Sequence, residues 1–111
     1  MIDWNRIAEL RDEIGIDDFH EVVDLFLREV EDTLDHLPDA PCDAANLERQ
    51  LHFLKGSALN LGFKKLAALC QAGEVGARNG VMDAIDTGRI RTAYVESRSE
   101  FFLELEARLA A

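Results

Sequence analysis

Apolar residues recur every three or four positions along most of the chain, which is the spacing of a buried stripe on an α-helix. This spacing predicts five helices, over about residues 3–14, 17–37, 43–61, 63–78 and 82–109. No segment alternates apolar and polar residues as a half-buried strand would. We therefore predict an all-α fold in which residues 1–111 form a single domain. Its expected architecture is an antiparallel four-helix bundle with an additional short N-terminal helix.

Polar residues before three of these helices predict where they begin. Asp3 and Asp43 stand where an N-cap side chain would accept a hydrogen bond from the first turn of the first and third helices. Asp17 or Asp18 is expected to open the second helix in the same way.

Glycine and proline predict several other boundaries. Gly62 follows the third helix, where a left-handed C-terminal cap is needed. Pro38 and Pro41 mark the end of the second helix. We expect the last helix to begin near Met82 or Asp83, unless the Thr87-Gly88 pair delays it.

The third predicted helix places a histidine outside its buried stripe. His52 lies roughly 140° from the centre of the stripe, because each residue turns a helix by about 100°. Lys55 and Gly56 follow one turn later on the same surface. Glycine inside a helix costs about 1 kcal/mol relative to alanine, so we expect Gly56 to leave room beside the imidazole. The stripe itself consists of Leu47, Leu51, Leu54, Ala58 and Leu61.

Charge narrows the classes of partner. The 111 residues include 22 acidic and 12 basic side chains, for a net charge of −10. We expect neither a nucleic acid nor an anionic membrane surface as partner, because both are themselves negatively charged. The N-terminal residues lack the pattern of a signal peptide, and no apolar run is long enough to span a membrane. The expected state is a cytoplasmic monomer.

The segment around His52 reverses this negative charge. Arg49, Lys55, Lys64 and Lys65 all fall in residues 49–65, which contain no Asp or Glu. A nucleophilic nitrogen with a cation one turn away and an open approach suits the carriage of a phosphoryl group. A surface histidine alone is more often inert, so this interpretation rests on the combination.

The same residues resemble the motif of histidine-containing phosphotransfer (Hpt) domains, which reads His-x-x-Lys-Gly-(Ser/Ala) with a further glycine downstream. The matching residues are His52, Lys55, Gly56, Ser57 and Gly62. The resemblance implies that His52 accepts a phosphoryl group from one receiver domain, or from a hybrid histidine kinase, and passes it to the receiver of a response regulator. It also implies that Lys55 stabilises the charge of the phosphate.

The resemblance further implies an orienting residue on the next helix, where the family commonly has Gln or Glu. Glu74 falls at that position. It would accept the Nδ1 proton of His52 and leave Nε2 as the nucleophile. In the alternative interpretation Glu74 is a solvated residue that pairs with Arg78, four residues later. For Ser57 we favour a structural role.

No cofactor or metal of the chain's own is expected, since no phosphate-binding loop or cluster of metal ligands is present. Phosphoryl transfer usually needs a divalent metal, so we expect Mg²⁺ on the partner receiver domain. Cys70 is in phase with the buried face of its helix and is expected in the core, while Cys42 follows a proline in a loop.

Apolar residues outside the main stripes suggest contact surfaces. Phe53 and Leu59 are expected to form a small docking patch near His52. Leu25, Leu27 and Phe102 leave some self-association open.

Two other functions stay open at this point. One is a non-catalytic helical binding module that docks or sequesters a receiver domain. The other is the dimerising helical domain of a histidine kinase, which would need a different histidine motif and an ATP-binding domain for which 111 residues leave no room. We therefore expect a phosphoryl carrier and not an ATP-dependent enzyme.

Overall fold

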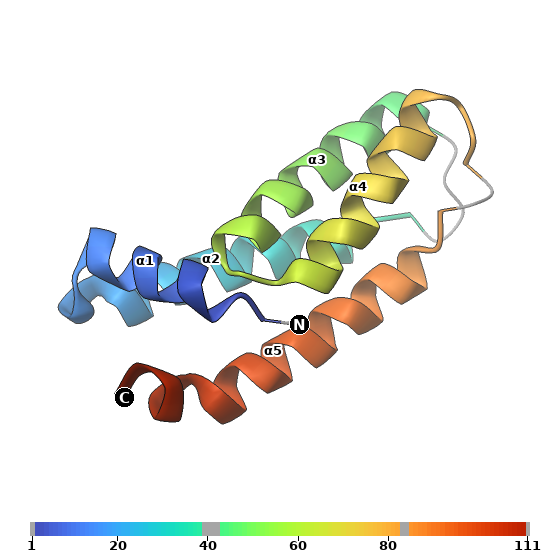
Figure 1. Cartoon of the computed structure of the whole chain (residues 1–111). Coiled ribbons are helices and arrows are strands. Elements are labelled where there is room, and N and C mark those ends of the chain that lie inside the picture. The colour runs from blue at the N-terminus through green and yellow to red at the C-terminus, as the bar shows by residue number, and fades with distance from the viewer. Residues whose placement is uncertain (1, 39–42, 83–84, 111) are drawn as a thin grey trace.

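Helices make up most of the described part of the chain (Figure 1). The computed structural model describes residues 2–38, 43–82 and 85–110, with side chains up to residue 108. Within these ranges the helices are α1 (Trp4–Ile14), α2 (Ile16–Asp35), α3 (Ala44–Asn60), α4 (Lys64–Arg78) and α5 (Thr87–Ala110).

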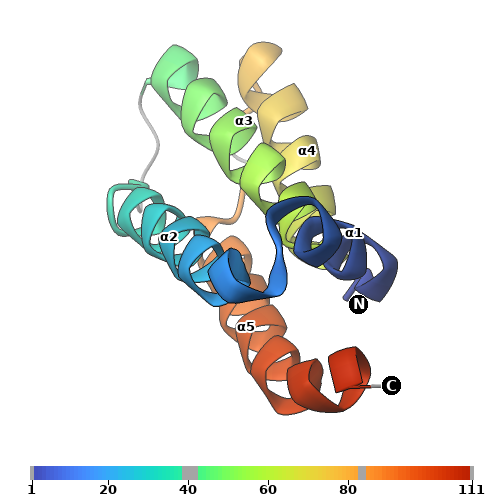
Figure 2. The same cartoon turned by 90° about the vertical axis from the view of Figure 1, so that its left-hand side faces the viewer.

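The helices pack into an elongated body whose Cα atoms extend over 45 × 20 × 20 Å. α3 and α4 lie side by side and form the most extensive contact between any two of the described helices (Figure 1, Figure 2). α5 packs against α4, and α2 packs against α3. The short α1 covers one end, where it contacts α2 and α3 (Figure 1). One side of the molecule is therefore formed by the α3–α4 pair.

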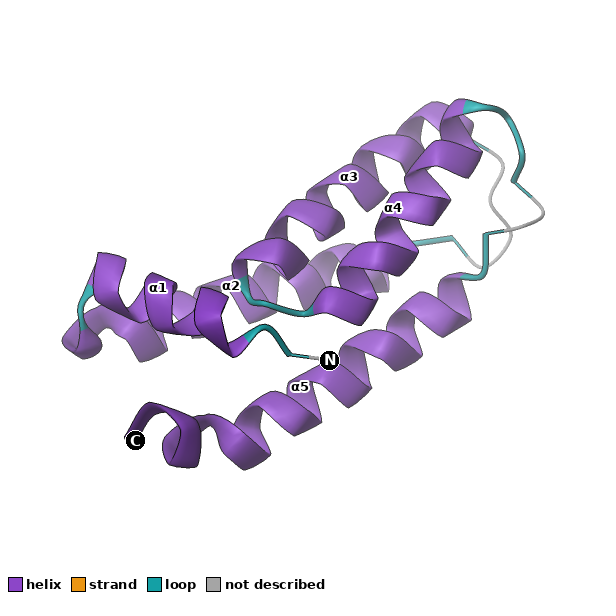
Figure 3. Cartoon of the chain, in the orientation of Figure 1, coloured by secondary structure: helices purple, strands orange, loops and turns teal. Residues whose placement is uncertain are grey.

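Regular secondary structure in the described ranges is entirely helical, and no strand forms there (Figure 3). A single antiparallel bridge joins Ile2, at the start of the chain, to Phe63 between α3 and α4. The predicted all-α fold class is confirmed.

Burial of its apolar stripe in the core determines which face of α3 points inward. Every residue of its predicted apolar stripe is at most 1 % exposed, which confirms the stripe. Aromatic rings from three parts of the chain extend this core, since Trp4 stacks on Phe101 and Phe63 meets Phe101 edge-on at 5.8 Å between ring centroids. Because the apolar face of α3 is held inward, its opposite face is left to solvent.

Two predicted helix starts and one predicted end are confirmed. The Asp3 carboxylate accepts a hydrogen bond from the backbone N–H of Arg6 at 3.2 Å, and that of Asp43 accepts one from Asn46 at 3.1 Å. Each therefore satisfies a donor that the first helical turn leaves unpaired. α2 ends before Pro38.

The expected start of the second helix was wrong. α2 begins at Ile16, directly after Gly15, whose φ of +96° is readily available only to glycine. The Gly15 carbonyl accepts a hydrogen bond from the N–H of Asp18 at 3.3 Å. Asp17 and Asp18 lie inside the first turn, where negative charge interacts favourably with the helix dipole.

The last helix begins at Thr87 and not at Met82. Of the two starts that the sequence allowed, the later one, at the Thr87-Gly88 pair, is therefore the one observed. Asp86 provides the reason, because its carboxylate accepts a hydrogen bond from the N–H of Arg89 at 3.0 Å. Asp83, the other predicted start, lies outside the described residues.

The turn between α3 and α4 requires glycine at position 62, as predicted. Gly62 has a φ of +71°, and a Cβ atom there would stand 2.7 Å from the carbonyl oxygen of Asp3. The N–H of Asp3 in turn donates a hydrogen bond to the Gly62 carbonyl at 2.7 Å. This contact joins the start of the chain to the turn between α3 and α4.

A second glycine brings the two helices close beside His52. A Cβ atom on Gly73 would lie 2.8 Å from Cδ1 of Leu51, which is fully buried. Leu51 immediately precedes His52, and Gly73 immediately precedes Glu74. The close approach of α3 and α4 therefore occurs at the level of the two predicted site residues.

One of three residues expected outside the main stripes is in fact core. Leu25 and Phe102 are 52 % and 45 % exposed, as predicted, whereas Leu27 is only 4 % exposed. Leu27 lies four residues after Val23 and three before Val30, both of which are buried, so at about 100° per residue it falls within the same apolar face of α2.

The buried role expected for Cys70 is confirmed. Burial raises the pKa of its thiol to about 12, because the thiolate is poorly solvated there. Ser57 is also buried, in agreement with a structural role. Pro41 and Cys42 lie outside the described residues.

Candidate functional site

α3 presents His52 to solvent on the side away from the core. The His52 side chain is 69 % exposed, whereas Leu51 and Leu54 on the same helix are fully buried. The prediction that His52 lies out of phase with the buried stripe is confirmed.

Glu74 on α4 holds one nitrogen of this ring. Its Oε1 atom lies 2.8 Å from Nδ1 of His52. The Glu74 side chain is only 4 % exposed, so a buried carboxylate contacts an exposed imidazole. Helix α4 thus brings Glu74 to the position that the sequence motif suggested.

The charge of Glu74 determines the tautomer of His52. The hydrogen bond from Lys55 lowers the pKa of Glu74, and the bond to His52 adds to this effect against the opposing influence of burial. An ionised carboxylate accepts hydrogen bonds and donates none. Nδ1 of His52 therefore carries a proton and donates a hydrogen bond to Glu74. In the neutral ring Nε2, the other nitrogen, then has a lone pair for chemistry.

Lys55 contacts α4 through the other oxygen of the Glu74 carboxylate. Its Nζ atom lies 2.8 Å from Oε2 of Glu74 and donates a hydrogen bond of 2.8 Å to Oε1 of Gln71. The Lys55 side chain is 22 % exposed. The ammonium group compensates the charge of Glu74 in this structure.

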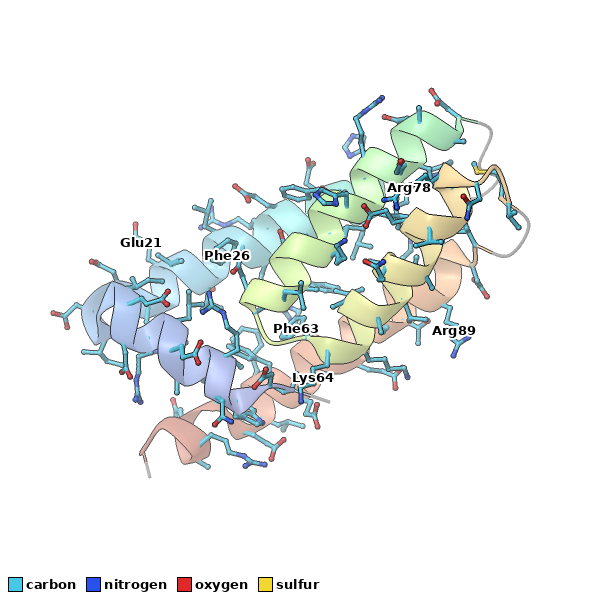
Figure 4. All side chains as sticks on the ribbon, turned by 45° about the horizontal axis from the view of Figure 1, so that its top comes forward. Glu21, Phe26, Phe63, Lys64, Arg78 and Arg89 are labelled. Carbon is cyan, nitrogen blue, oxygen red and sulfur yellow. The ribbon has the colours of Figure 1, made fainter. Side chains whose placement is uncertain are left out.

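Arg78 adds a third partner for Glu74 and is a residue that sequence reasoning undervalued. Its Nη2 atom donates to Oε1 of Glu74 at 3.2 Å, and its Nε atom lies 3.5 Å from Oε1 of Glu48 on α3. Figure 4 labels Arg78 near the end of α4 next to α3. The spacing of four residues did predict this pair, but Glu74 is buried in it and not solvated.

The basic residues between positions 49 and 65 are spread along both α3 and α4. Lys64 occupies the first turn of α4, at the opposite end of that helix from Arg78 (Figure 4). Lys65 pairs with Glu96 on α5 at 3.9 Å. Of the four basic residues in the segment, only Arg49 and Lys55 lie within one turn of His52.

An open hollow of about 490 Å³ lies beside the imidazole, lined by Ala45, Glu48, Arg49, His52 and Glu74. A hollow of about 540 Å³ lies between α2 and α5, but its lining contains no histidine or cysteine, so we do not assign the site there. On the other side of His52, a Cβ atom at Gly56 would meet no atom within 4 Å. The surface around the ring is therefore accessible to a large partner.

Two exposed apolar side chains lie on the same helix as His52. Phe53 is 42 % and Leu59 is 56 % exposed. In the described ranges no group of three His, Cys, Asp or Glu side chains is placed to hold a metal ion. None of the described helices is both long and apolar enough to cross a membrane.

A comparison with protein families connects this geometry to a known class. The sequence model of the Hpt domain matches residues 21–111, which include His52 and Glu74 and extend from α2 through α5. The chain belongs to the Hpt domain family. Neither the curated proteins nor the solved structures gave a match to the chain.

Membership of the Hpt family establishes the general function. Hpt domains are phosphotransfer modules of two-component phosphorelays, in which they interact with receiver domains and histidine kinases. They carry phosphoryl groups and are not kinases themselves. The resemblance found in the sequence is confirmed, and helix α1 lies outside the matched range.

Proposed function

We propose that the chain carries a phosphoryl group on Nε2 of His52 between the aspartate of one receiver domain and that of another. A histidine kinase is the alternative source of the group. The observation that carries this proposal is the 2.8 Å contact between the buried Glu74 carboxylate and Nδ1 of an exposed histidine. This contact supports a ring that is oriented, accessible and nucleophilic at the opposite nitrogen.

In the forward step the lone pair of Nε2 attacks phosphorus, so that an N–P bond forms as the P–O bond to the aspartate breaks. The electron pair of the broken bond stays on the aspartate carboxylate. The ring becomes positively charged while Nδ1 keeps its proton, and the nearby carboxylate of Glu74 stabilises that charge. The reverse sequence delivers the phosphoryl group to the next receiver. Mg²⁺ on the receiver would neutralise the charge of the transferring group.

The other predicted site residues support this reaction from α3. Lys55 offsets the charge of Glu74 and supplies positive charge near the transferring phosphate. Gly56 leaves the approach to the ring open, since it carries no side chain. Phe53 and Leu59, both exposed, would contact the docked receiver. The proposal includes a single domain in which α2 to α5 form an antiparallel four-helix bundle, acting as a cytoplasmic monomer.

The direct test of this function is transfer from a phosphorylated receiver. Wild-type chain is mixed with a receiver that carries ³²P on its aspartate, and transfer of the label is followed on a gel. We expect wild type and a His20→Gln control, which removes another exposed histidine, to take up acid-labile label. His52→Gln should take up none while it keeps its helical circular dichroism spectrum.

Two outcomes would contradict the proposal. Acid-labile label on His52→Gln would place the phosphoryl group elsewhere. A wild-type chain that binds the receiver without becoming labelled would instead be a non-catalytic binding module. Incubation with ATP alone is expected to label neither the wild-type chain nor His52→Gln.

A further inference from the structure

The hollow beside His52 lies toward the N-terminal end of α3. Apart from Glu74 of α4 and His52 itself, its lining comes from Ala45, Glu48 and Arg49, all of which precede His52, and Lys55 is not part of it. Helical side chains tilt toward the N-terminus of their helix, so the imidazole covers the turn that contains Arg49. The imidazole and the Arg49 side chain therefore line the same open space.

The cations near the imidazole differ in how far they are already paired. Lys55 is held by Glu74 and Gln71, and Arg78 is held by Glu74 and Glu48. Arg49 is exposed, and no other described residue forms a hydrogen bond or ion pair with its guanidinium group. Arg49 is thus the nearby cation whose donors are all available for a new anion.

We propose that Arg49 binds the phosphoryl group on His52 by donating hydrogen bonds to its oxygens. The inference rests on the proposed function, because it requires phosphorylation at Nε2. Side chains three residues apart on a helix have Cβ atoms about 5–6 Å apart, within reach of an arginine. The planar guanidinium group matches the geometry of phosphate oxygens.

Charge gives this contact a function. A phosphoryl group brings a charge near −2 into a hollow already lined by the carboxylates of Glu48 and Glu74. Lys55 and Arg78 already compensate these carboxylates. Arg49 adds the positive charge that the phosphorylated state needs, so it stabilises the loaded carrier relative to the empty one.

The test is a ³¹P NMR titration of the phosphorylated full-length chain. Each protein carries His20→Gln and His36→Gln, so that phosphoramidate, a small-molecule phosphoryl donor, finds a single histidine. A cation in contact favours the dianionic phosphoryl group. We therefore expect Arg49→Gln to titrate about 0.3 to 0.7 pH units higher than the parent, equivalent to a two- to five-fold weaker preference for the dianion. Arg49→Lys should recover part of this shift.

Arg89→Gln is the matched control. It removes the same charge from an exposed arginine at the start of α5 (Figure 4). Arg89 lines a hollow separate from the one beside His52. We expect this variant to titrate like the parent. If Arg49→Gln is phosphorylated but titrates like Arg89→Gln, the inference about Arg49 is overturned and the carrier function stands. If none of the proteins is phosphorylated on His52, the proposed function fails as well.

Discussion

Glu74 connects the residues of the site through one buried carboxylate. Its two oxygens meet His52, Lys55 and Arg78 from both α3 and α4. Helical periodicity placed His52 on the surface of α3, but the pairing with Glu74 came from the family motif. Periodicity within single helices could not supply it, because the pairing depends on how α4 lies along α3, and this involves the turn through Gly62 and the close approach of Gly73 to Leu51.

Glu74 should make the stability of the protein depend on pH. Folding lowers its pKa below 4.5, so its contribution is fully present above about pH 4.5 and is lost as pH falls through the folded-state pKa. We expect Glu74→Gln to lower the free energy of unfolding by about 1–3 kcal/mol at pH 7 and by less at pH 3, as measured by urea unfolding. Glu104→Gln, in an exposed pair with Arg108, should cost under about 1 kcal/mol at both values. Equal losses at both pH values for Glu74→Gln would contradict this assignment.

Cys70 should be chemically inert while the chain is folded. Its thiol is fully buried and its pKa is raised to about 12, so thiolate is scarce at pH 8. In a Cys42→Ser background, we expect iodoacetamide to modify Cys70 in 8 M urea but not in buffer, as measured by mass spectrometry. Equally fast modification in both solutions would show that the thiol is accessible in the native protein.

At the scale of helices, the site depends on the close packing of α3 against α4. Helix starts were predictable where an aspartate capped the first turn, as at Asp3 and Asp43. At α2 the start was mispredicted, because the chain passes through Gly15 with a positive φ and needs no side-chain cap. The Gly73 contact with Leu51 could not be predicted either, since it exists only once the two helices have met.

Two glycines in these helices should respond in opposite ways to substitution by alanine. The gain in helix propensity, about 1 kcal/mol, is similar for both. A Cβ atom at Gly56 meets nothing within 4 Å, so Gly56→Ala should be stabilised by about that amount. At Gly73 the new Cβ atom would collide with buried Leu51, and we expect Gly73→Ala to be about 1–3 kcal/mol less stable than Gly56→Ala in urea unfolding.

Gly56→Ala should also change the rate of phosphotransfer. Gly56→Ala narrows the approach to His52 and should slow transfer from a phosphorylated receiver despite its higher stability. A variant that is more stable and transfers as fast as wild type would show that space at Gly56 is not required. A Gly73→Ala protein as stable as Gly56→Ala would mean that α3 and α4 separate easily.

Across the whole molecule, acidic and basic side chains are concentrated on different helices. α2 carries eight acidic residues and one arginine, whereas α3 and α4 together carry five lysines or arginines and two glutamates. A net charge of −10 therefore coexists with a side of the molecule that favours an anionic group. The sequence was sufficient to predict the all-α fold and this local reversal. It was not sufficient to show which cations meet at the imidazole, because that depends on the packing of α3 and α4.

In the proposed mechanism Nε2 of His52 carries the phosphoryl group, because Glu74 holds Nδ1. The most direct measurement is a ³¹P–¹⁵N correlation spectrum of the ¹⁵N-labelled chain after transfer from a phosphorylated receiver. We predict that phosphorus couples to Nε2 of His52 while Nδ1 retains its proton toward Glu74. Coupling to Nδ1, or a phosphoryl group on any other residue, would contradict this mechanism.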